Sequence, residues 1–148
     1  FGKKIKAKTD FINLARKKNI QVTNFVINNI LNLLKKINFR RNKVLIIGVA
    51  YKKDINDYRE SPSLKIMNTL YKKKISFDYY DPFVSQIDFL NKKLYSLKNL
   101  KNISSYDVVA VITDHSILPY KEILKKSKII VDTRGCYKDI KSNKIIFL

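Results

Sequence analysis

Residues 43–82 read KVLIIGVAYKKDINDYRESPSLKIMNTLYKKKISFDYYDP. The nearly continuous apolar run at 43–49 predicts a strand buried on both faces, which is the pattern of parallel sheets. A polar loop at 51–60 follows that strand. Ser61 and Pro62 then indicate the cap and the first position of a helix, because a serine oxygen accepts a backbone amide and proline is preorganised there. The stretch therefore starts as a strand, a loop and a helix.

The rest of the same stretch closes a βαβ unit. The helix is expected to end in the lysines at 72–74, and a second strand at 75–80 stops before Pro82, which cannot continue a ladder. The remaining chain is expected to form a helix at 84–90, a strand at 106–112, a short helix at 119–126, a strand at 128–131 and an edge strand at 144–148. This alternation predicts an α/β, Rossmann-like three-layer sandwich with a mostly parallel sheet.

A long helix is predicted ahead of the sheet. From Asp10, which can act as an N-cap, to about Ile37 the apolar residues recur at helical spacing, and no proline or glycine interrupts them. Such a helix is either a core helix or a spine that also packs against another domain or subunit. We favour the second interpretation, because the apolar positions drift around the helix.

The composition limits which kinds of site and which class of protein are possible. The chain has 148 residues, one cysteine, Cys136, and one histidine, His115. An internal disulfide, a cysteine-based zinc site and a histidine-rich metal site are therefore excluded, and no metal is expected. No apolar run approaches the roughly 20 residues that span a bilayer, and the chain opens without a signal segment. We expect a soluble, cytoplasmic piece with no membrane partner.

The net charge of +19 raises the question of nucleic-acid binding, because clustered basic residues neutralise phosphates. Lysine far outnumbers arginine, however, and lysine doublets stand where the predicted helices end and complement the helix dipole. We therefore interpret the charge as a solvated surface and expect no nucleic-acid partner. The same charge helps to attract an anionic ligand.

Three polar segments, at 51–60, 113–115 and 132–135, each follow a predicted strand. Ligands bind beyond the carboxyl ends of parallel strands, so we expect these segments to form one anion-binding cleft, with backbone donors from the helix that starts at Ser61. Gly48 stands alone instead of in a three-glycine dinucleotide fingerprint, so side chains would have to hold a phosphate. The candidate residues are Lys52, Lys53, Arg59, His115 and Arg134.

Several short motifs now become recognisable. They are GVAYKK at 48–53, DYRESPS at 57–63, YYDP at 79–82, TDH at 113–115 and VDTR at 131–134. Together they resemble the C-terminal UDP-binding domain of the UDP-glucose/GDP-mannose dehydrogenase family. The closest resemblance is to the branch that oxidises UDP-N-acetylglucosamine or UDP-N-acetylmannosamine.

The resemblance implies a function for each part of the chain. Such an enzyme oxidises the C6 alcohol of a UDP-sugar to the uronate with two NAD+, through a cysteine-bound intermediate. Residues 1–42 would be the central helix region that forms a homodimer, and 43–148 the Rossmann-like UDP-sugar-binding domain. The cysteine nucleophile, the NAD motif and the catalytic lysine would lie upstream of Phe1, so the chain alone is expected to be inactive. By the same resemblance Tyr51, Lys52 and Arg134 would contact the UDP-sugar, and Arg59 the NAD.

Other interpretations of these residues stay open. His115 is expected to brace a strand end, and Cys136 to pack. Asp81 stands where Rossmann folds place an acid on a ribose, but Pro82 after it equally favours a turn. A stand-alone nucleotide-binding module would use the same cleft without a partner domain. A basic nucleic-acid-binding protein is the remaining alternative.

Overall fold

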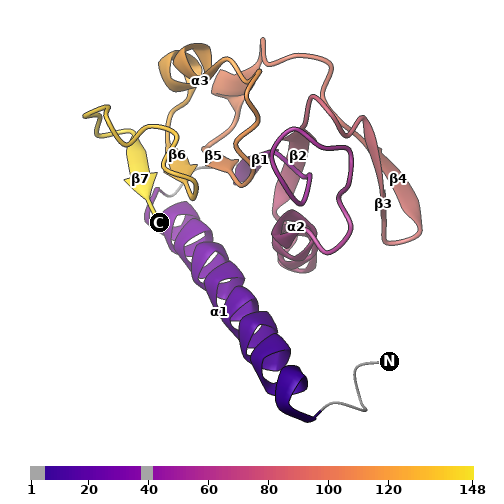
Figure 1. Cartoon of the computed structure of the whole chain (residues 1–148). Coiled ribbons are helices and arrows are strands. Elements are labelled where there is room, and N and C mark those ends of the chain that lie inside the picture. Colours follow the sequence, from indigo (N-terminus) through magenta and orange to yellow (C-terminus); the bar gives the residue numbers. More distant parts are fainter. Residues whose placement is uncertain (1–5, 38–41) are drawn as a thin grey trace.

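A computed structural model describes residues 6–37 and 42–148, with the side chains of the first helix described from residue 12 onward (Figure 1). The elements, in chain order, are α1 (Lys6–Ile37), β1 (Lys43–Ile47), α2 (Pro62–Lys72), β2 (Ser76–Tyr80), β3 (Gln86–Phe89), β4 (Lys92–Tyr95), the 3₁₀ turn η2 (Ile103–Ser105), β5 (Val108–Val111), α3 (Tyr120–Lys126), β6 (Ile130–Asp132) and β7 (Ile145–Phe147). No helix in this part of the chain is long and apolar enough to cross a bilayer.

Five strands form one sheet in the order β2-β1-β5-β6-β7, and every neighbouring pair is parallel. The chain passes from β1 outward to β2 and then returns to place β5 on the other side of β1. This is a doubly wound sheet, and the crevice between the carboxyl ends of β1 and β5 is its topological switch point. The predicted Rossmann-like fold with a mostly parallel sheet is confirmed.

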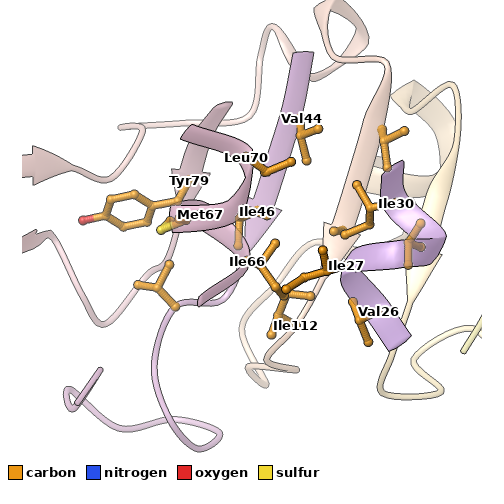
Figure 2. Close-up of a cluster of buried hydrophobic side chains, with 14 of the residues drawn as sticks. Val26, Ile27, Ile30, Val44, Ile46, Ile66, Met67, Leu70, Tyr79 and Ile112 are labelled. Atoms are coloured by element: carbon orange, nitrogen blue, oxygen red, sulfur yellow. The ribbon is translucent and has the colours of Figure 1, made fainter. Parts of the chain in front are cut away.

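The sheet is covered on both faces. Val44 and Ile46 of β1 point toward α1 and α2, and Figure 2 shows these two helices closing over that face. The alternate residues Leu45 and Ile47 point to the other face, where Ile123 of α3 packs. Figure 1 shows α3 on the opposite side of the sheet from α2. The three predicted layers follow from this alternation of buried side chains on each strand.

Only the second half of α1 packs on the sheet. Val26, Ile27, Ile30 and Leu34 are buried in the core, whereas the first half of the helix extends beyond the sheet (Figure 1). The helix also begins earlier than predicted, because its backbone is already helical at Lys6. Asp10 therefore lies inside the helix and is not its N-cap.

The loop that precedes α2 ends as the sequence predicts. The Ser61 side chain accepts a hydrogen bond from the Ser63 amide at 3.2 Å, and Pro62 occupies the first turn. Ser63 is fully buried, and its hydroxyl donates to the Gly48 carbonyl at 2.8 Å. The start of α2 is thereby fixed against the end of β1.

The predicted helix at 84–90 is wrong. The segment forms the first strand of a two-stranded antiparallel hairpin, β3–β4. Leu90 and Asn91 turn the chain with φ angles of 49° and 62°, as a type I′ turn requires. Phe89 packs edge-on against Phe77 and Tyr71, so contacts with β2 and α2 decide the structure of a segment whose local pattern is ambiguous.

Candidate functional site

A cleft of about 640 Å³ lies at the carboxyl end of the sheet, between the middle of α1 and the start of α2. Its floor comes from Ile112, directly after β5, and from Thr133 after β6. One wall is α1, with Arg16 and Thr23. The other comprises the loop after β1 and the first turns of α2. The cleft therefore occupies the switch point, where ligands of open parallel sheets bind.

The three residues predicted to contact a UDP-sugar all line this cleft. They are Tyr51, Lys52 and Arg134. The Lys52 ammonium lies 5.9 Å from the centre of the Tyr51 ring, and that ring is about half exposed. The Arg134 guanidinium donates through Nε to Asp114 at 3.0 Å, which fixes the direction of a side chain that is otherwise exposed.

The other predicted residues lie elsewhere. Arg59 is outside the cleft lining, where its guanidinium donates to both oxygens of Asp57, at 3.0 and 2.9 Å. Its side chain is 84% exposed, so this pair closes a surface turn. These hydrogen bonds lower the pKa of Asp57 to about 2. Lys53 and His115 line a separate hollow of about 330 Å³.

The cleft contains charged residues that the sequence did not single out. Arg16 and Lys65 add two cations to Lys52 and Arg134, and Glu60 is the one acidic residue of the lining. Neither added cation belongs to a recognisable motif. Both reach the cleft only because α1 and α2 flank the switch point. Four cations against one carboxylate make the cleft a site for an anion.

The start of α2 contributes fewer backbone donors than predicted. Pro62 has no amide hydrogen, the Ser63 amide is taken by the Ser61 side chain, and the Leu64 amide by the Ser61 carbonyl. The helix dipole still favours an anion at this end. Side chains would therefore have to hold a phosphate here. The sequence already indicates this, because Gly48 stands alone and not in a three-glycine motif.

Gly48 serves packing at this edge of the sheet. Its φ is +82°, and a Cβ at this position would lie 2.4 Å from the Thr113 carbonyl oxygen. The absence of a side chain lets the end of β1 approach the segment after β5. Thr113 in turn donates its hydroxyl to the Ala50 carbonyl at 2.7 Å. Two of the polar segments that shape the cleft are thereby joined.

Asp81 is a buried acceptor at the centre of this region. One carboxylate oxygen accepts the amides of Val49 and Ala50, at 2.7 and 2.9 Å. The other accepts the Phe83 and Val84 amides, which forms the turn around Pro82. Nε2 of His115 lies 3.0 Å from the first oxygen. With its oxygens occupied in this way, Asp81 is a structural clamp and not a ribose ligand.

Cys136 is half-buried in the hollow beside His115. Burial, followed by the negative charge of Asp132, raises the pKa of its thiol to about 11. A thiol with that pKa is protonated at neutral pH and is a poor nucleophile. The part of the chain that the structure describes holds no cluster of three or more metal-binding side chains.

The chain is similar in sequence to a family of known enzymes. The model of the UDP binding domain of the UDP-glucose/GDP-mannose dehydrogenase family matches residues 45–139. The UDP-N-acetyl-D-mannosamine dehydrogenase of Methanococcus vannielii is 36% identical over 133 residues, which are 84% of this chain and 30% of that protein. The enzyme of the same name from Pyrococcus horikoshii is 28% identical over 142 residues, or 90% of this chain and 32% of that protein.

Solved structures agree with the sequence relatives. A UDP-N-acetyl-mannosamine dehydrogenase from S. aureus superposes with a TM-score of 0.70 and 26% identity, covering 95% of this chain and 33% of that one. The Pyrococcus horikoshii enzyme gives a TM-score of 0.69 and 26% identity, covering 92% and 32%. The chain thus spans about a third of the length of the proteins it matches.

Proposed function

The chain belongs to the UDP-glucose/GDP-mannose dehydrogenase family, and from this premise we propose that it is the substrate-binding part of an NAD-dependent UDP-sugar 6-dehydrogenase. The observation that carries the proposal is the cationic cleft at the switch point, because Tyr51, Lys52 and Arg134 meet there. The names of the relatives favour a UDP-N-acetylhexosamine as the substrate.

The charges of the cleft suit a nucleoside diphosphate. Arg16 comes from α1, Lys52 from the loop after β1 and Lys65 from α2, so a diphosphate between these elements would meet cations from each of them. The half-exposed ring of Tyr51 offers an apolar face for the uracil base. Glu60 repels the phosphates, but the four cations of the lining outnumber it.

In the reaction that we propose for the whole enzyme, the sugar C6 alcohol would be oxidised in two steps, each giving one hydride to an NAD+. One water molecule would supply the second oxygen atom of the carboxylate, and three protons would be released. The contribution of this chain is to hold the UDP moiety and thereby orient the sugar toward a nucleophile carried outside it. Cys136 does not fill that role, since its pKa is about 11 and it lies outside the cleft.

Two further parts of the proposal concern surfaces. Arg59, at the exposed turn before α2, would contact the NAD bound to a neighbouring domain. The exposed face of α1 would pair with a second copy of the chain. Leu14 and Phe25 support this, because each is more than half exposed and they stand away from the core-facing side of the helix.

Calorimetric titration with UDP tests the central claim. Lys52→Ala removes a charge-assisted hydrogen bond of roughly 1.5–3 kcal/mol, so we expect UDP affinity to fall about tenfold or more. Lys125→Ala is the matched control, since that lysine is exposed on α3 and does not line the cleft. Equal losses in the two variants would mean that bulk charge attracts the nucleotide and that the cleft is not the site.

A further inference from the structure

The first part of the loop at 51–60 carries Tyr51 and Lys52 and has little packing of its own. At the end of the loop, Tyr58 packs against the core and its hydroxyl hydrogen-bonds Asp88 at 3.3 Å. Residues 51–56 are all exposed. Its backbone folds back on itself, since the Tyr51 amide donates to the Asp57 carbonyl at 2.7 Å. This bond shapes the loop without joining it to the rest of the domain. Tyr58 fixes only the end of the loop, so a contact nearer to Tyr51 and Lys52 must set the direction in which these side chains meet the cleft.

Asp54 makes that contact at the far side of the loop. Its backbone amide donates to Nδ1 of His115 at 2.9 Å. Its carboxylate accepts the Ser116 amide at 2.8 Å and the Ser116 hydroxyl at 2.6 Å. These hydrogen bonds lower the pKa of the Asp54 carboxyl. We call this set of three bonds the Asp54 latch.

The anchor of the latch is rigid. His115 has no exposed surface, and its ring packs on Phe83 with 4.9 Å between ring centres. Because Nδ1 accepts the Asp54 amide, the ring proton sits on Nε2 and is donated to Asp81 at 3.0 Å. Asp81 also holds the amides of Val49 and Ala50, the two residues directly before the loop. The loop is thus fixed at its start through Asp81, at its middle through His115 and at its end through Tyr58.

We propose that His115 is a positioning residue, which through the Asp54 latch holds the loop in the conformation that presents Tyr51 and Lys52 to the nucleotide. The proposal rests on the proposed function. A loop released from the latch samples other conformations, and the apparent affinity for UDP then falls with the fraction of loops that remain competent. His115 itself is outside the cleft lining, so its effect on UDP is indirect.

Two nearly isosteric substitutions distinguish the role of Nδ1 of His115 from the role of Nε2. The amide of asparagine overlays Nδ1, so His115→Asn keeps an acceptor for the Asp54 amide and loses the donor to Asp81. The amide of glutamine overlays Nε2, so His115→Gln keeps the donor to Asp81 and loses the acceptor for Asp54. The latch requires the acceptor. We expect about a fivefold to tenfold loss of UDP affinity in His115→Gln and at most about twofold in His115→Asn.

Amide hydrogen exchange in the absence of ligand measures directly how strongly the Asp54 latch orders the loop. We expect the amides of residues 53–57 to exchange at least about tenfold faster in His115→Gln, and at nearly the wild-type rate in His115→Asn. Ser116→Ala removes one exposed hydroxyl and leaves the core intact, so it should fold and give a smaller acceleration of the same amides. If a substitution of the buried His115 prevents folding, the Ser116→Ala variant still tests the latch.

The outcomes are distinguishable. Unchanged loop exchange in both His115→Gln and Ser116→Ala would overturn the latch, as would an equal loss of UDP affinity in His115→Asn and His115→Gln. Failure of the wild-type chain to bind UDP would instead contradict the proposed function, while the exchange rates would still report whether the latch orders the loop.

Discussion

At the scale of single residues, two glycines with positive φ differ in the space available for a side chain. Gly48 has a φ of +82° and no room for a Cβ, whereas Gly135 has a φ of +72° and nothing within 4 Å of a Cβ. The backbone penalty for alanine is about 1–2 kcal/mol at either position. Only at Gly48 does a steric clash with Thr113 add to it.

We therefore expect Gly48→Ala to destabilise the chain by at least about 3 kcal/mol, and Gly135→Ala by about 1 kcal/mol. Chemical denaturation of the two variants measures the difference. Similar losses would mean that the end of β1 can move away from the Thr113 segment at little cost, and that the close approach is not required.

Arg59 gives a second prediction at this scale. Hydrogen bonds from its side chain, followed by one from its backbone amide, lower the pKa of Asp57 from 3.8 to about 2. The folded pKa lies below the unfolded value, so this pair stabilises the fold above about pH 4, and the contribution is lost as pH falls toward 2. In the assembled enzyme, an Arg59 that contacts NAD would have to leave Asp57.

In Arg59→Ala the Asp57 pKa should rise only part of the way back to 3.8, because the backbone donor remains. NMR titration of the Asp57 carboxyl carbon measures the rise. Asp54 is the internal reference, since its lowered pKa comes from Ser116 and not from Arg59. An unchanged Asp57 pKa would show that the two side chains are not paired in solution.

The candidate site divides into residues that the sequence could reveal and residues that it could not. Lys52 and Arg134 each stand three residues after a predicted strand, and the carboxyl ends of parallel strands share one edge. Their convergence therefore follows from topology alone. Arg16 and Lys65 reach the same cleft from helices, and their contribution depends on how those helices cross the sheet. No local pattern encodes that direction.

At the scale of elements, the strength of the local pattern decided what could be predicted. The apolar run of β1 and the Ser61-Pro62 start of α2 have few alternative interpretations, and both were placed within two residues. The hairpin was missed because β3 has only four residues, and Leu90 is not a residue that favours a type I′ turn. Its stability comes from Phe89 packing on residues distant in the sequence.

This unfavourable turn residue leads to a prediction for the hairpin. Leu90 has a φ of 49° and is half exposed, so Leu90→Asn relieves backbone strain and removes no buried contact. We expect a gain of about 0.5–1 kcal/mol, or roughly 1–4 °C in Tm for a chain of this length. Leu90→Ile is the control, since a β-branched side chain tolerates positive φ less well and should lower Tm. Equal Tm values would indicate that the turn is not type I′ in solution.

At the scale of the whole molecule, α1 has one face in the core and another that is exposed. Its buried face, with Ile30 and Leu34, completes the core, and its opposite face leaves Leu14 and Phe25 exposed by 55% and 56%. These two residues are eleven positions apart, which is three helical turns, so they project from the same side. The sequence revealed an excess of apolar positions on the helix, but only the packing on the sheet shows which of them remain exposed.

Self-association through this face has a characteristic dependence on salt. Two copies that each carry a net charge of +19 repel one another, and screening that repulsion favours their contact. Binding to nucleic acid has the opposite dependence, because salt weakens it by counterion competition. Salt therefore distinguishes an apolar dimer surface from a basic surface that binds polyanions.

We expect sedimentation velocity to show more dimer as NaCl rises from about 50 mM to about 300 mM, with association driven by burial of the exposed α1 face. The double variant Leu14→Gln/Phe25→Gln should stay monomeric throughout, since it removes the two largest side chains of that face. Tyr95→Gln, which removes an exposed aromatic ring from β4 on the distant hairpin, should behave as the wild type. A wild-type chain that is monomeric at every salt concentration, or that loses dimer as salt rises, would contradict the assignment of α1 as the surface that meets a second copy.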